Sequence, residues 1–149
     1  MWTGEYIQYT SPLDYNKALR VSGNHPELTS VFFHFHPIVI KDWSVSAPYS
    51  HLAGGMKYHD GKLTVPTTGR YYIYLQVYYH SVGRIYVYVN GKPVTMFQGP
   101  WPGKGDHGTA YSAGVFNLKS GDIITIASAS ANCRIFMYTY HTYFGAYLI

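Results

Sequence analysis

The chain of 149 residues has little charge and one cysteine. Charged residues make up 12% of it, and no apolar run reaches the roughly 18 residues of a membrane-spanning helix. With Cys133 alone, no intrachain disulfide can form. The opening residues, MWTGEYIQYT, have neither the basic start nor the apolar stretch of a secretory signal. Apolar residues make up 47% of the chain, enough for the core of one domain.

Acidic residues are also scarce, which argues against hydrolase chemistry. The seven carboxylates show no pair spaced to face each other, as a glycosidase would need. The segment GPWPGKG (99–105) is one residue short of a phosphate-binding loop and ends in Gly105 where Ser or Thr would hold magnesium. The segment AYSAG (110–114) resembles a nucleophile elbow, but no helical pattern follows it. We expect no enzyme activity and no catalytic residue.

Metal, cofactor and nucleic-acid sites are equally weak in the sequence. His34 and His36 share a strand face, but no third ligand lies nearby, so we expect an exposed pair and no metal site. Cys133 is expected to be an inert, partly buried thiol. The eleven Lys and Arg residues are scattered singly, which argues against a nucleic-acid footprint despite the net charge of +4. No cofactor is expected.

Strand signals repeat about every 10–15 residues, and helical periodicity is nearly absent. The pattern predicts an all-β sandwich or barrel for residues 16–149, preceded by a tail at 1–15. Asn90-Gly91 predicts a type I′ hairpin, because both residues tolerate positive φ. The predicted strands cover residues 16–23, 31–40, 51–58, 62–66, 70–80, 84–89, 92–97, 109–118, 123–129 and 142–149.

One predicted strand, GRYYIYLQVYYH (69–80), has two different faces. Alternation gives it an ordinary core face of Tyr71, Ile73, Leu75, Val77 and Tyr79. The opposite face is aromatic but also carries hydroxyls, an amide and an imidazole. Its residues are Tyr72, Tyr74, Gln76, Tyr78 and His80.

Three collinear stretches resemble the tumour necrosis factor ligand family. They are GKLTVPTTGRYYIYLQVYY (61–79), AYSAGVFNLKSGDIITI (110–126) and TYFGAYLI (142–149). KALRVSGN (17–24) and Trp43 are weaker echoes of the same family. Ectodysplasin-like members give the most similar unbroken run, over 129–149.

The resemblance implies a two-sheet antiparallel jelly roll of about ten strands that assembles as a homotrimer. Grooves between its subunits would bind and cluster cysteine-rich cell-surface receptors. The protein would be an extracellular cytokine, secreted or shed as the ectodomain of a type II membrane protein, with no membrane insertion by this segment. The residues implied at the trimer axis are Tyr72, Tyr74, Gln76, Tyr111, Tyr143 and Tyr147.

The family resemblance implies the receptor-contact residues less directly than the residues at the trimer axis. The candidates are Asn90 at a hairpin tip, Trp101 and Lys104 in the Gly/Pro-rich loop, and Arg134. Two alternatives remain open at this point. One is a trimeric recognition module similar to the globular head of the first complement component, which shares the fold. The other is a jelly-roll hydrolase or carbohydrate-binding protein.

Overall fold

The described part of the chain consists of strands and their connections. The computed structural model describes residues 6–10, 18–20, 38–47, 50–81, 83–99, 107–129, 133–137 and 140–149, with backbone alone for 6–10, 18–20 and 81. Within these ranges there are twelve strands. They are β1 (Tyr6–Thr10), β2 (Ala18–Arg20), β3 (Ile38–Val39), β4 (Lys57–His59), β5 (Lys62–Thr64), β6 (Gly69–Ser81), β7 (Arg84–Val89), β8 (Lys92–Gln98), β9 (Gly108–Leu118), β10 (Ile123–Ser128), β11 (Arg134–Phe136) and β12 (Tyr143–Leu148).

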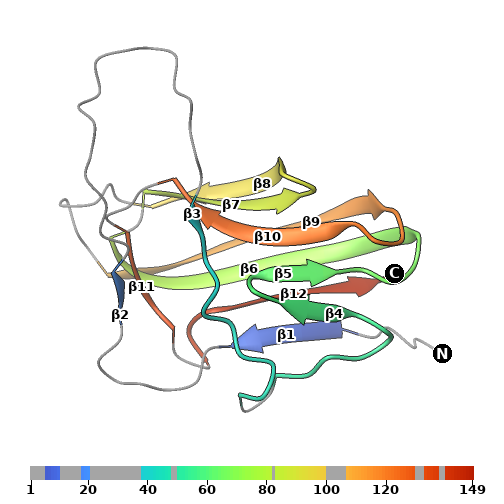
Figure 1. Cartoon of the computed structure of the whole chain (residues 1–149). Coiled ribbons are helices and arrows are strands. Elements are labelled where there is room, and N and C mark those ends of the chain that lie inside the picture. The colour runs from blue at the N-terminus through green and yellow to red at the C-terminus, as the bar shows by residue number, and fades with distance from the viewer. Residues whose placement is uncertain are drawn as a thin grey trace.

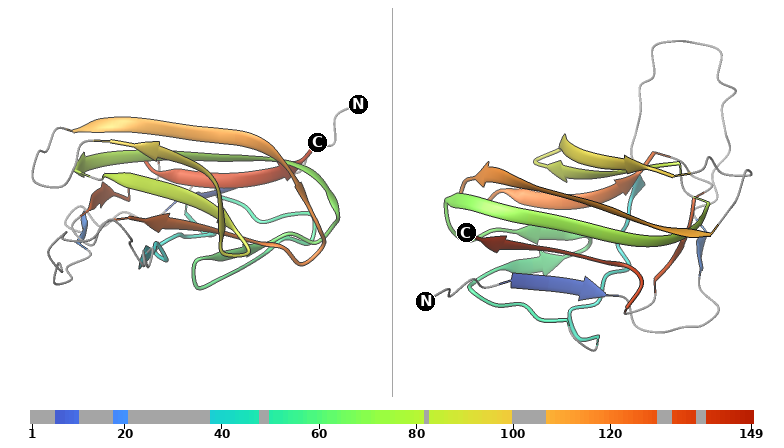
Figure 2. Two further views of the ribbon diagram at one scale, coloured as in Figure 1. Left: turned by 90° about the horizontal axis from the view of Figure 1, so that it is seen from above. Right: turned by 180° about the vertical axis from the view of Figure 1, so that it is seen from behind.

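The strands form two six-stranded antiparallel sheets. The first sheet has the order β1-β12-β6-β11-β2, with β9 also paired to β6. The second has the order β4-β5-β10-β7-β8, with β3 also paired to β10. In Figure 1 the strands of one sheet lie over those of the other, and the right-hand view of Figure 2 brings β6, β12 and β1 to the front. The prediction of an all-β, two-sheet antiparallel fold is confirmed.

Strand β6 organises the first sheet. It pairs with β9 along almost its whole length, from Gly69 opposite Leu118 to Tyr79 opposite Gly108. Its other edge pairs first with β12 and then with β11. At the change of partner, the buried Thr142 hydroxyl accepts a hydrogen bond from the Tyr78 N–H (3.0 Å) and donates one to the Phe136 carbonyl (2.7 Å).

The core lies between the sheets and follows the predicted alternation. Tyr71, Ile73, Leu75 and Val77 on β6 are buried. Phe144 on β12 is fully buried as well and is among the largest such side chains. The second sheet contributes a matching apolar face, since alternate residues of its strands also point inward. Its buried members include Leu63, Ile85, Val87, Ile124 and Ile126.

Two tight hairpins in the second sheet have the same chemistry. Asn90 (φ 50°) and Gly91 (φ 77°) connect β7 to β8, which confirms the predicted hairpin. Asp60 (φ 47°) and Gly61 (φ 80°) connect β4 to β5 in the same way. The turn at Asp60-Gly61 was not predicted, although Asp-Gly is as typical of a type I′ turn as Asn-Gly.

Several strand predictions need correction. Residues 51–56 are not extended strand, because Gly54 and Gly55 form a turn with positive φ, and β4 begins only at Lys57. A strand also lies within the segment expected to be a tail, since β1 pairs with β12 along five residues. The short strand β11 was not predicted. In 16–23 and 31–40 the described strand residues are only 18–20 and 38–39, and 21–37 lie outside the description.

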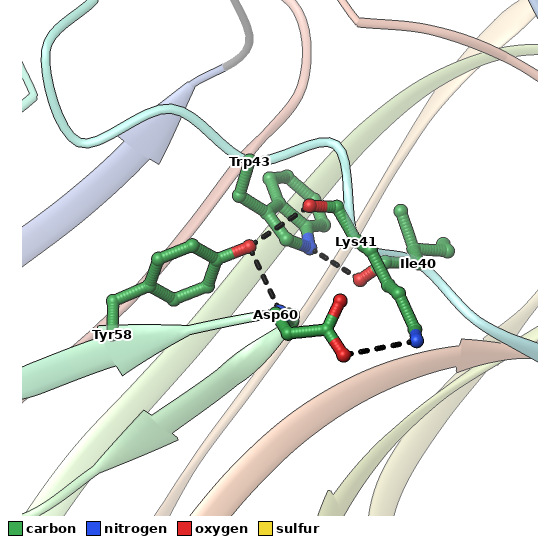
Figure 3. Close-up of polar contacts among 6 residues, drawn as sticks. Ile40, Lys41, Trp43, Tyr58 and Asp60 are labelled. Carbon is green, nitrogen blue, oxygen red and sulfur yellow. Dashed lines mark hydrogen bonds and ion pairs between the residues drawn. The ribbon is translucent and has the colours of Figure 1, made fainter.

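The segment before β4 is fastened to the β4–β5 hairpin and to the core (Figure 3). The Trp43 indole N–H donates to the Ile40 carbonyl (2.9 Å), and the Trp43 ring packs edge-on against Phe144, with centroids 4.7 Å apart. The Tyr58 hydroxyl donates to the Lys41 carbonyl (3.0 Å) and accepts from the backbone N–H after Asp60 (3.1 Å). Burial raises the pKa of Tyr58, so this hydroxyl keeps its proton.

Candidate functional site

The outer surface of the first sheet carries a continuous set of tyrosines, which we call the tyrosine face. The register aligns Tyr143, Gln76 and Tyr111 in one cross-strand row. It aligns Tyr147 and Tyr72 in another row, four residues away along each strand. Residues directly opposite one another in a ladder share a face. The tyrosine face therefore consists of Tyr72, Tyr74, Gln76, Tyr111, Tyr143 and Tyr147, the six residues that the family resemblance implied for a trimer axis.

Direct contacts join the members of the tyrosine face. The Tyr72 ring lies 5.3 Å from that of Tyr147 and 6.2 Å from that of Tyr74, and the Tyr74 ring lies 6.3 Å from that of Tyr143, all between centroids. The hydroxyls of Tyr72 and Tyr111 are 3.0 Å apart. These spacings are typical of favourable aromatic pairs.

Gln76 sits at the centre of one row and is held at both ends of its amide. The Tyr143 hydroxyl donates to Gln76 Oε1 (3.0 Å), and Gln76 Nε2 donates to the His141 carbonyl (3.2 Å). Both polar atoms of the amide therefore have a partner within the chain. Its position is fixed before any partner arrives, which lowers the entropy lost on binding.

The tyrosine face is partly exposed to solvent in the single chain, most of all at Tyr111. Tyr111 is 52% exposed, and Val115, in the row of Tyr72, is 46% exposed. Partial burial, followed by the hydrogen bond to Tyr72, raises the pKa of Tyr111, so its hydroxyl is uncharged near neutral pH. Large exposed residues on one surface are typical of interaction sites in soluble proteins.

The first sheet also lacks negative charge. None of its six strands contains Asp or Glu, which is a property of their sequences alone. Among residues with described side chains in these strands, the cations are Arg70 and Arg134, both exposed and both outside the tyrosine face as defined. The six residues of the tyrosine face carry only rings, hydroxyls and an amide, while the exposed Arg70 lies two residues before Tyr72 on the same side of β6.

A second aromatic group continues the outer surface beyond Gln76, and we call it the histidine cluster. The Tyr78 ring lies 4.5 Å from that of His141 and 5.0 Å from that of Phe136. The His107 ring lies 4.5 Å from that of His80 and 5.6 Å from that of Phe136. Alternation had placed Tyr78 and His80 on this surface, but the other three members come from distant segments. Only the ladder register shows that they meet.

The predicted receptor-contact residues do not form one site. Asn90 lies at the tip of the β7–β8 hairpin, and its side chain is used locally, donating to Asp122 Oδ1 (2.8 Å) and accepting from the Ile123 N–H (2.9 Å). Arg134 is exposed on β11, opposite Ser81 and hence near the other end of β7. Trp101 and Lys104 lie outside the described residues.

The weak catalytic and metal motifs gain nothing from the structure. Ser112 lies within β9, which continues to Leu118, so AYSAG is not the strand-to-helix turn of a nucleophile elbow. The Ser112 hydroxyl is 2.6 Å from that of Thr95 on β8, a contact between the two sheets. Cys133 is fully buried, more than expected, and burial raises the pKa of its thiol. Within the described ranges no three metal-binding side chains converge, and His34 and His36 lie outside them.

Part of the chain matches a family of known proteins. Residues 41–98 match the model of the TNF (Tumour Necrosis Factor) family. The match spans β4 to β8 and so includes Tyr72, Tyr74 and Gln76, but it excludes β9 and β12, which carry the other three residues of the tyrosine face. No curated protein sequence matches the chain.

Solved structures extend the likeness to the whole fold. The chain is similar to murine APRIL at pH 5.0, with a TM-score of 0.69 and 21% identity over 99% of this chain and 100% of that one. Two further structures of murine APRIL, at pH 8.0 and 8.5, give TM-scores of 0.66 and 0.63 at 21% and 20% identity, with the same coverage of both chains. The fold is thus shared, while the similarity to ectodysplasin-like members over 129–149 stays a prediction.

Proposed function

We propose that the protein is a cytokine ligand of the tumour necrosis factor type that assembles as a homotrimer through the tyrosine face. The observation that carries the proposal is the contiguity of that face. Six residues from three strands form one open aromatic surface without a carboxylate. The family match over residues 41–98 supports the ligand type and favours it over a complement-head-like or carbohydrate-binding module.

The chemistry of the face suits contact with copies of itself. An aromatic side chain buries about 150–250 Å² when it is covered, and tyrosine can also give and accept a hydrogen bond at its rim. The six residues of the face carry no charge, so copies of it would meet there without repulsion between like charges. A ring of three copies would cover Tyr111, whose side chain is 52% exposed in one chain.

Receptor binding follows from such an assembly. Grooves between neighbouring subunits would hold cysteine-rich extracellular receptors, and three occupied grooves would cluster them without any chemical step. Arg134, Trp101 and Lys104 are the candidate contacts, since Arg and Trp are typical interface anchors. Asn90 is a weaker candidate, because both ends of its amide already bind within the chain. The ligand would act outside the cell, as a secreted or shed domain. No helix in the described part of the chain has the length and apolar character of a membrane span.

The proposal is tested by the molecular mass of the assembly and by its binding to receptors. Light scattering on a size-exclusion column at micromolar concentration should give about three times the 16.9 kDa of one chain. Biosensor measurements against a panel of cysteine-rich receptor ectodomains should then find at least one saturable partner. A monomer at that concentration would contradict the proposed trimer interface at the tyrosine face. A trimer that binds no receptor in the panel but binds glycans would favour the carbohydrate-binding alternative.

A further inference from the structure

We infer that pH controls the association of this chain with copies of itself, through the histidine cluster at one end of the tyrosine face. The inference rests on the proposed function, because it concerns the regulation of the same surface. It predicts an assembly that is tight near neutral pH and weakened in mild acid.

The two groups of residues form one continuous surface. Gln76, in the tyrosine face, donates to the carbonyl of His141, whose ring packs on Tyr78. Tyr78 and His80 lie two and four residues beyond Gln76 on β6 and so share its face. His107 is the residue directly before β9, and its ring lies 4.5 Å from that of His80, tilted by 32°. An interface that covers the tyrosine face therefore reaches three imidazoles from each chain.

The surroundings offer these imidazoles no negative charge among the described residues. Strand β6 contributes Tyr78, and β11 contributes Phe136, with exposed Arg134 two residues before it. The segment before β12 contributes Tyr140, whose ring lies 4.4 Å from that of His141. Asp106, next to His107 in sequence, lies outside the described residues.

Two imidazole nitrogens of the cluster are already buried, the Nδ1 atoms of His80 and His141. His80 Nδ1 has no solvent-exposed surface and no hydrogen-bond partner. The hydroxyl of Tyr78 lies 3.5 Å from His107 Nδ1, at the limit of a hydrogen bond. The rings around His80 and His107 are aromatic, and aromatic rings cannot balance the charge of a protonated imidazole as a carboxylate would.

The sign of the pH effect follows from linkage. Histidine changes charge between about pH 5 and 8. Burial penalises the charged imidazolium, and three copies of the cluster would bring like charges together. The free chain therefore takes up protons more readily than the assembly does. Because the dissociated state binds more protons, lowering the pH favours dissociation.

The experiment measures mass and dissociation constant by sedimentation velocity at pH 7.5 and 5.5, at fixed ionic strength. For the unmodified chain we expect the dissociation constant to rise at least about tenfold, as uptake of one or more protons requires. Circular dichroism at pH 5.5 should still show native strand content, so that dissociation is not confused with unfolding. The variant His80→Gln/His107→Gln/His141→Gln should lose most of this pH dependence. The matched control His59→Gln, on β4 of the second sheet, should retain it.

The outcomes separate this inference from the proposed function. A trimer with the same dissociation constant at both pH values would overturn the pH control. It would still agree with a trimer interface at the tyrosine face. A monomer at both values would overturn both. If the triple variant does not fold, His80→Gln alone should reduce the pH dependence. An unchanged pH response in that folded variant would also overturn the role of the cluster. A variant Asp106→Asn that removes the pH response by itself would assign the effect to the carboxylate instead of the histidines.

Discussion

The hydroxyls of Tyr72 and Tyr111 lie 3.0 Å apart, although the two residues sit two rows away from each other in the ladder. Tyr72 is opposite Val115, and Tyr111 is opposite Gln76, so each side chain leans along its strand toward the other. Ala113 is the residue between Val115 and Tyr111 on the same face, and its short side chain suits that arrangement. The pair orders the tyrosine face within one chain, before any association.

Tyr111→Asp should convert the assembly to monomer near pH 7. The change places a carboxylate on the most exposed tyrosine of the face, and three copies would meet in a poorly solvated interface. An uncompensated buried charge costs several kcal/mol, so the dissociation constant should rise at least about a hundredfold. Light scattering across a dilution series measures this, and receptor binding should fall with it.

Met96→Asp is the matched control, because Met96 is also an exposed apolar residue but lies on β8 of the second sheet. It should remain trimeric. If Tyr111→Asp also remains a trimer with an unchanged melting temperature, the tyrosine face is not the axis.

Asp122 should contribute stability that disappears in acid. The Lys119 backbone N–H, and next the Asn90 side-chain amide, hold the pKa of Asp122 below its ordinary value. A lowered folded-state pKa stabilises the fold above the unfolded pKa, near 4, and this contribution is lost as the pH falls through the folded pKa. The difference in unfolding free energy between the unmodified chain and Asp122→Asn should therefore shrink between pH 5 and pH 3. Urea unfolding at each pH measures it.

Asp42→Asn, a change of the same charge at an exposed position, serves as the control. A difference that stays constant with pH would contradict the assignment.

Gly61→Ala should destabilise the protein more than Gly91→Ala. The two glycines have almost the same φ, 80° and 77°, so the backbone strain of alanine is matched at about 1 kcal/mol. A Cβ at Gly61 would lie 3.0 Å from Val39 and 3.1 Å from the Ile40 carbonyl, whereas a Cβ at Gly91 meets nothing within 4 Å. The crowding at Gly61 should add about 1–3 kcal/mol. If urea unfolding shows equal losses of unfolding free energy in the two variants, β3 moves away from the new Cβ with no loss of stability.

Cys133 should be unreactive in the folded protein. Its side chain is fully buried, and burial raises the pKa of the thiol, so little thiolate forms near neutral pH. An aromatic disulfide reagent at pH 7.5 should modify it only at the rate of unfolding and fully in denaturant. Rapid modification of the native protein would contradict the buried position.

The fold could be predicted from the sequence wherever the signal was local. Alternation along 69–80 separated the buried Ile73 and Leu75 from the outward Tyr72 and Tyr74, and Asn90-Gly91 identified a turn. Strands of three residues, such as β11, are too short to show alternation and could not be predicted in that way. The histidine cluster was missed for a different reason. His107 and His80 are 27 residues apart, and only the pairing of Gly108 with Tyr79 brings them together.

Thr142 has a consequence for how this sheet tolerates change. Its single hydroxyl joins Tyr78 of the central strand to Phe136, at the point where one neighbouring strand replaces another. A slip of one residue by β12 would turn every one of its side chains to the opposite surface. Because the hydroxyl fixes the chain directly before β12, we expect an insertion earlier in the preceding connection to leave the pairing of β12 with β6 unchanged. The tyrosines of β12 would then keep their alignment with β6 even if the length of that connection varied over evolutionary time.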